Sequence, residues 1–152
     1  MNTVQFRIRE TLTWKRVRDY FVFLGILGVI FSLITISGNY LLAPPYAVSA
    51  YLIVFQRNTK FSSMRSIGAT YALVILSSDI LHFFLGVSLA GMIISVVIVS
   101  AFVTFTNLTH PPAIALTIFS YIAGNPLDFT ISSVLSLGVL LTASLIMEKC
   151  GL

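Results

Sequence analysis

The stretch LAGMIISVVIVSAFVTFTNL, residues 89–108, carries no charged side chain and leads through Thr109-His110 into Pro111-Pro112. A helix needs about 20 mainly apolar residues to cross the hydrocarbon layer of a bilayer, so this stretch predicts a spanning helix. Proline lacks a backbone N–H and breaks a helix interior, so the spanning helix ends before the pair. In the first half of the chain, the apolar residues 20–36 precede a second pair, Pro44-Pro45.

The composition of the whole chain points to lipid as its solvent. Of 152 residues, 57% are apolar and only 9% are charged, whereas soluble domains average about 25% charged residues. A globule of this size leaves much of its surface exposed and could not hide so much apolar area from water. A single cysteine gives neither a disulfide framework nor a cysteine metal site. We therefore expect an all-α integral membrane protein.

Long and short apolar runs alternate along the chain in a repeated order. The four long runs, each expected to span the bilayer, are residues 20–36, 67–85, 89–108 and 129–147. The two short runs, residues 44–55 and 111–123, begin at the proline pairs. This order predicts one transmembrane domain, residues 20–147, made of two three-segment repeats, residues 20–85 and 89–147. Because each repeat crosses an odd number of times, the second is inverted relative to the first.

The positions of the basic residues predict the orientation. All nine Lys and Arg lie in residues 1–19, 56–66 and 148–152, which become cytoplasmic if every run crosses. If the short runs merely dipped in and returned, the basic loop would lie outside, against the positive-inside tendency. A cleaved signal peptide fits poorly, because proline follows the only suitable small residue, Ala43. We expect a multi-pass protein of the inner or plasma membrane with both termini cytoplasmic.

The short proline-initiated helices suggest a transport site. Short or proline-interrupted segments at matching positions of two halves indicate a transporter binding site. A helix of about 13 residues covers only about 20 Å, so irregular backbone must complete the crossing and must face protein or a watery cavity. Inverted repeats would bring the two helix starts together near the midplane, where unpaired N–H groups and positive dipole ends favour an anion. Alternatively, the prolines only kink or start ordinary tilted helices.

Polar side chains near the proline pairs complete the expected anion site. His110 could donate a hydrogen bond to an anion or carry a proton, or it could simply cap a helix or bond a carbonyl. Ser49 and Thr117 would add hydroxyl groups, and Asn107 would line the inner mouth or bond a neighbouring helix. The predicted substrate-binding residues are Pro44, Pro45, Ser49, Asn107, His110, Pro111, Pro112 and Thr117.

Asp79 and His82 are ionisable residues inside a predicted span. They are three residues apart and share one helix face. Ionisable groups within spans are functional candidates, so we expect this pair to couple protons to transport. The alternative is that they reach water or pair with each other near the helix end.

The residues around both proline pairs resemble the HPP family of integral membrane proteins. His110-Pro111-Pro112-Ala113 resembles the family signature, and the segment from Pro45 to Ala50, together with Gly68, resembles a second characteristic region. The chain departs from the pattern at Val48, Ile114 and Leu116. The resemblance covers residues 20–147 and implies four membrane spans. It also implies transport of nitrite or a similar monovalent anion, which is linked to plant and cyanobacterial members.

Other functions fit the sequence less well. The two histidines and five acidic residues form no ligand cluster or catalytic motif, so we expect no enzyme, metal or cofactor. The basic residues do not alternate with aromatic ones, so nucleic acid is not an expected partner. A non-transporting assembly or anchoring subunit is the main alternative to a transporter. The expected partners are the lipid bilayer, a small anion and further copies of the chain.

Overall fold

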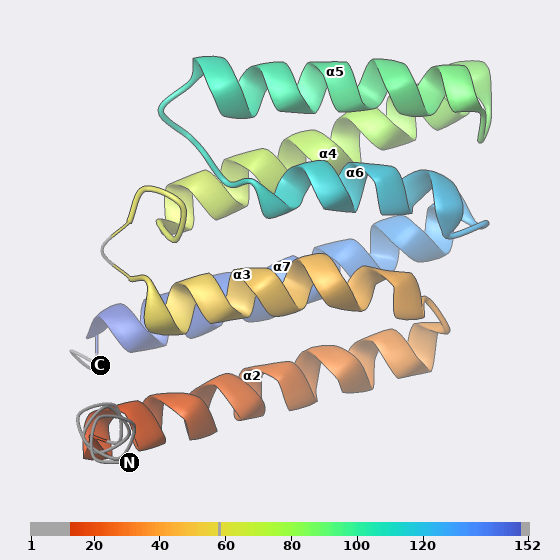
Figure 1. The fold of residues 1–152 in the computed structure, drawn as a ribbon. Helices are drawn as coiled ribbons and strands as arrows, with labels where there is room; N and C mark the ends of the chain where they lie inside the picture. Colours follow the sequence, from red (N-terminus) through yellow and green to blue (C-terminus); the bar gives the residue numbers. More distant parts are fainter. Residues whose placement is uncertain (1–12, 58, 150–152) are drawn as a thin grey trace, which may run out of the picture.

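The computed structural model describes residues 13–57 and 59–149, which form helices and no strand (Figure 1). The prediction of an all-helical chain is confirmed for this part. In chain order the elements are α2 (Trp14–Ser37), the short 3₁₀ helix η1 (Tyr40–Leu42), α3 (Ala43–Phe55), α4 (Met64–Leu85), α5 (Leu89–Phe105), α6 (Pro112–Ile122) and α7 (Pro126–Lys149).

Three of these helices, α2, α4 and α7, are long and apolar enough to cross a membrane, as expected of a membrane protein. α5 is shorter than predicted. It has 17 residues, or about 25 Å of rise, and ends at Phe105 rather than at Leu108. Thr106 ends it, because this residue is extended and its hydroxyl donates to the Phe102 carbonyl (2.7 Å) and accepts from the Leu108 N–H (3.2 Å). Such side-chain bonds compete with the helix.

α2 begins before the apolar run that predicted it. Thr13 caps the helix by accepting from the N–H of Arg16 (3.4 Å), so the helix starts at Trp14 instead of residue 20. The last part of the predicted basic N-terminal segment, residues 1–19, is therefore helical, and its residues 1–12 lie outside the described part. At the other terminus, α7 extends to Lys149, into the predicted tail of residues 148–152.

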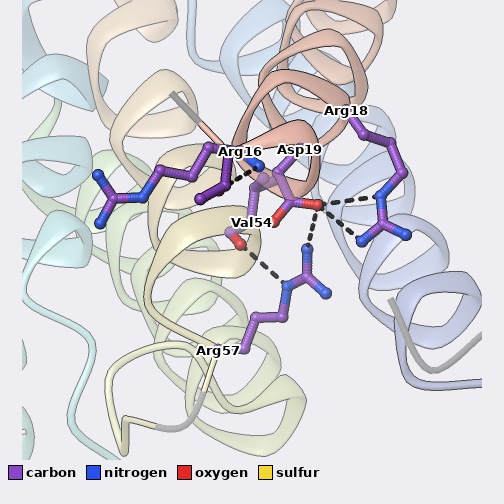
Figure 2. Close-up of polar contacts among 6 residues, drawn as sticks. Arg16, Arg18, Asp19, Val54 and Arg57 are labelled. Atoms are coloured by element: carbon purple, nitrogen blue, oxygen red, sulfur yellow. Dashed lines mark hydrogen bonds and ion pairs between the residues drawn. The ribbon is translucent and has the colours of Figure 1, made fainter. Parts of the chain in front are cut away.

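A charge cluster joins the start of α2 to the end of α3 (Figure 2). The carboxylate of Asp19 is almost buried and lies 3.1 Å from Arg18 Nη2 and 3.3 Å from Arg57 Nη2. Arg57 also donates from Nε to the Val54 carbonyl (2.9 Å). Two of the basic residues that predicted the orientation therefore also link α2 to α3.

The helices pack in two layers (Figure 1). α4 and α7 contact each other and lie behind α3 and α6, which also touch. α2 packs against α3 and α7 at one edge, and α5 packs against α6 and α4 at the other. Buried apolar side chains from several helices fill the space between the layers, among them Ile30, Tyr46, Val74, Leu116 and Leu140.

The two ends of the bundle differ in charge. One, here called the basic end, holds the start of α2, the 56–63 connection, the start of α4 and the end of α7 (Figure 1). Every Lys and Arg in the described residues lies on these segments. The opposite end holds the connections 38–39, 86–88 and 123–125 and carries Asp128 at the start of α7. Within the described residues, the Lys and Arg side chains are therefore confined to one end of the bundle.

Candidate functional site

The two proline pairs line one pocket between α3 and α6, with a volume of about 340 Å³. This is near the lower end of the range for small-molecule sites, about 300–1,000 Å³. All its lining side chains are apolar: Pro44, Pro45, Val48, Leu52, Phe61, Pro111, Pro112 and Ala115. The structure thus brings together the four prolines that the sequence analysis assigned to a shared site.

His110 lies directly before the second proline pair and is completely buried. Its Nδ1 is 2.6 Å from the Phe61 carbonyl oxygen, and its Nε2 is 2.8 Å from Ser49 Oγ. A carbonyl can only accept, so Nδ1 carries a proton, and in the neutral ring Nε2 accepts from the Ser49 hydroxyl. Both ring nitrogens are therefore bonded to protein groups, as in the alternative in which this histidine bonds a carbonyl.

Ser49 stands at the centre of a buried network that also contains Tyr71. Ser49 Oγ lies 2.5 Å from the Tyr71 hydroxyl and 2.9 Å from the Pro45 carbonyl oxygen, and the Tyr71 hydroxyl lies 3.1 Å from the same carbonyl. Each hydroxyl has one proton to donate. If Ser49 donates to His110, the single Tyr71 proton is shared between Ser49 Oγ and the Pro45 carbonyl oxygen, so each of these acceptors has a donor within reach.

Aromatic rings extend this network across the bundle. The Tyr71 ring meets the His110 ring edge-on at 5.1 Å and the Tyr46 ring at 5.2 Å. The Tyr46 hydroxyl donates to the Ser133 carbonyl of α7 (3.0 Å). Sequence reasoning did not assign Tyr46, Tyr71 or Phe61 to the site. The available signal was a tyrosine within an apolar run, since a buried phenol usually needs a hydrogen-bond partner.

The Ser49–His110–Phe61 series has the distances of a nucleophile, a base and an orienting group. It lacks the other parts of an acyl-transfer site. Ser49 and His110 are both fully buried, and the Ser49 oxygen also lies within hydrogen-bond distance of the Tyr71 hydroxyl and of the Pro45 carbonyl oxygen. No backbone N–H at the start of α6 is free to stabilise an oxyanion. In this structure the Ser49 hydroxyl and both His110 ring nitrogens are all bonded to other protein groups.

The free N–H groups expected where the short helices begin are not there. At α6, Pro111 and Pro112 have no N–H, and the N–H groups of Ala113 and Ile114 donate to the carbonyls of His110 (3.1 Å) and Pro111 (3.0 Å). At α3, the prolines again have no N–H, and Ala43 donates to the Tyr40 carbonyl of η1. Proline fits a helix start because no N–H is needed there, and for the same reason it offers a ligand no donor.

The other two predicted binding residues lie outside the pocket lining. The hydroxyl of Thr117 is buried and donates to the Ala113 carbonyl of its own helix (3.0 Å). Asn107 is exposed on the connection between α5 and α6. Farther along α6, the buried Ser120 hydroxyl donates to the Ser78 hydroxyl of α4 (2.9 Å). The contact between these two helices is therefore partly polar.

Asp79 and His82 lie on α4 toward the end opposite the basic end, away from the proline pocket. Asp79 Oδ1 accepts a hydrogen bond from Thr130 Oγ1 of α7 (2.6 Å). The His82 ring is buried against the Tyr121 ring of α6, with centroids 4.3 Å apart at an angle of 67°. Neither His82 ring nitrogen has a hydrogen-bond partner within the described part of the chain.

Among residues 13–57 and 59–149, no three His, Cys, Asp or Glu side chains lie close enough to hold a metal ion. A comparison of the chain with protein-family models, with curated proteins and with solved structures finds no match in any of the three.

Proposed function

We propose that this chain transports a small monovalent anion, such as nitrite, across the cell membrane, as its resemblance to the HPP family implies. The observation that carries the proposal is the meeting of two proline-initiated short helices, from opposite halves of the chain, at one pocket. Transporters built from repeats commonly form their substrate sites in this way.

The proposal includes two inverted repeats, α2–α4 and α5–α7, with the basic end in the cytoplasm. The helix pairings support it: α2 packs on α3 and α7, and its counterpart α5 packs on α6 and α4. Each helix of the first half also runs opposite to its counterpart in the second half (Figure 1). A two-fold axis in the membrane plane, between the α3–α6 and α4–α7 pairs, would relate the halves. α5 would then cross in a locally thinned bilayer.

The pocket chemistry favours a weakly hydrated anion. α3 has 13 residues and α6 has 11. The aligned peptide dipoles of each helix leave its start positive, although the prolines remove the free N–H donors. The apolar lining offers no replacement for a tightly held hydration shell, so phosphate or sulfate would lose much more than nitrite on entry. Ser49 lies one helical turn after Pro45, and His110 directly precedes Pro111, so the Ser49–His110 pair adjoins two residues of the pocket lining. Opening their mutual hydrogen bond would free the Ser49 hydroxyl to donate to the anion, and His110 Nε2 would donate as well once it takes up a proton.

Within the same proposal, Asp79 and His82 couple protons to anion movement. His82 is buried without a hydrogen-bond partner in the described residues, and Asp79 is bonded to Thr130 across the α4–α7 contact. Asp79 thus links α4 to α7, and His82 supplies a titratable group whose ring nitrogens no described residue bonds.

The second candidate is a non-transporting assembly subunit. One observation favours it: the pocket lining is wholly apolar, and Val48 at its edge is 49% exposed. An apolar side chain of a partner helix would fit such a pocket, since membrane helices associate by close packing.

Nitrite flux into liposomes that contain only this protein separates the two candidates. The transporter proposal predicts saturable flux that Val48→Trp reduces at least tenfold, because the larger side chain fills the pocket. Val134→Trp is the matched control, since Val134 is similarly exposed on α7 and lies outside the pocket lining. Flux equal to that of empty liposomes would reject transport and leave the assembly role. Equal loss of flux in both variants would reject the pocket as the site.

A further inference from the structure

His82 is a buried titratable group that the proline pocket does not use. It is 9% exposed, and both its ring nitrogens are buried without a hydrogen-bond partner in the described residues. A neutral imidazole has one donor and one acceptor, and buried polar side chains are nearly always paired with protein, water or a ligand. His82 is therefore free to bind water or a ligand that enters between the helices.

The His82 ring of α4 packs against α6, and α5 packs against its partner there. Tyr121 of α6 stacks edge-on against it at 4.3 Å, with its hydroxyl oxygen also buried. Gly91 of α5 leaves room for the Tyr121 ring, because a Cβ at Gly91 would lie only 3.1 Å from Tyr121 Cε1. The Tyr121 ring can therefore lie against His82 because Gly91 on α5 has no side chain in its way.

The charged side chains at the His82 end of the bundle, within the described residues, are negative. Asp79 lies one turn earlier on α4 and is held by Thr130 of α7. Asp128, at the start of α7, accepts a hydrogen bond from Asn125 (2.7 Å). α5 carries no titratable residue, and on α6 the only one is Tyr121. No Lys or Arg of the described ranges lies at this end. An anion approaching a neutral His82 would therefore meet only like charge.

We propose that His82 and Tyr121 form an outer binding site for the transported anion, and that the anion binds there together with one proton on His82. This inference rests on the proposed function. Protonation turns His82 into a donor at both nitrogens, and the Tyr121 hydroxyl adds a third donor. The imidazolium also offsets the charge of Asp79, and a paired charge is far less costly than a single one inside a membrane. Each anion that enters from this side brings one proton with it.

NMR of the ¹⁵N-labelled histidines tests the site without measuring transport. The sequence has two histidines, so His82→Gln identifies the His82 signals directly. Adding sodium nitrite at pH 7 should move the His82 signals toward the imidazolium position. In Tyr121→Phe the half-saturating nitrite concentration should rise at least tenfold, as expected for losing a hydrogen bond to a charged group. Tyr51→Phe is the control, because Tyr51 is half exposed on α3, and it should titrate like the wild type.

Flux measurements separate this inference from the proposed function. Wild-type nitrite uptake should fall as the outside pH rises from 6 to 8, and His82→Gln should remove that dependence. If the wild type transports nitrite while the His82 signals ignore it, or Tyr121→Phe titrates like the wild type, the outer site is wrong and transport stands. If the wild type shows neither nitrite flux nor a nitrite response, the proposed function falls and the outer site with it.

Discussion

Ser49→Ala offers the sharpest test of the buried network. Among the described residues it removes the only donor to His110 Nε2 (2.8 Å), and it leaves the Tyr71–Pro45 bond in place (3.1 Å). The His110 ring cannot adopt its other neutral tautomer, because Nδ1 must donate to the Phe61 carbonyl. Nε2 is therefore left buried and unpaired.

The magnitude follows from two figures. A hydrogen bond between membrane helices contributes about 0.6 kcal/mol on average and at most about 1.7 kcal/mol. An unpaired buried acceptor costs about 1–3 kcal/mol. The second figure already includes the lost bond, so Ser49→Ala should lower the free energy of unfolding by about 1–3 kcal/mol. Ser32→Ala is the matched control, because the Ser32 hydroxyl also bonds the carbonyl four residues earlier (2.8 Å) but is exposed. It should change stability by less than about 0.5 kcal/mol.

Equilibrium unfolding in mixed micelles of dodecyl maltoside and dodecyl sulfate, followed by far-UV circular dichroism, measures both variants. In a His110→Phe background there is no nitrogen to leave unpaired, so Ser49→Ala should cost at least about 1 kcal/mol less than in the wild type. Equal costs for Ser49→Ala and Ser32→Ala would refute the network as described. Equal costs in both backgrounds would show that the effect does not pass through His110.

Other predictions concern topology, packing and the anion. Single cysteines at Lys60 and Asn125 should be labelled by an impermeant reagent from opposite membrane faces; labelling of both from outside would reject the proposed orientation. Gly91→Ala should destabilise the protein by up to about 2 kcal/mol in the same unfolding assay, because overpacking against Tyr121 outweighs the gain in helix propensity. Gly28→Ala, with nothing within 4 Å, should not. His110→Ala should weaken nitrite binding about tenfold to hundredfold in a titration; unchanged affinity would remove His110 from the site.

The helical segments were largely predictable because their boundaries are local. The proline pairs set the starts of α3 and α6, and Gly38 and Gly86, both with positive φ, end α2 and α4. The errors were also local in origin. The Thr13 cap extended α2 backward beyond the apolar run, and the Thr106 hydroxyl ended α5 early. Hydropathy does not detect either effect, because both depend on single hydroxyl groups.

The site was less predictable because it depends on contacts between distant segments. His110 bonds both Ser49 and the Phe61 carbonyl. These three residues lie in separate segments, and no repeat or spacing in the sequence indicates that the segments meet. We expected free N–H groups because the starts of helices generally have them. The prolines that mark these two helix starts have no N–H, so the expected donors are missing. The contact between His82 and Tyr121 was missed because the sequence places Asp79, not Tyr121, near His82.

Anion selectivity in liposomes containing only the wild-type protein tests the central claim most directly. The apolar pocket between two helix starts predicts saturable uptake of nitrite, with phosphate uptake no faster than the leak into protein-free liposomes. Nitrite uptake at the leak rate would contradict transport. Equal protein-dependent uptake of nitrite and phosphate would contradict the assignment of the proline pocket as the selective site.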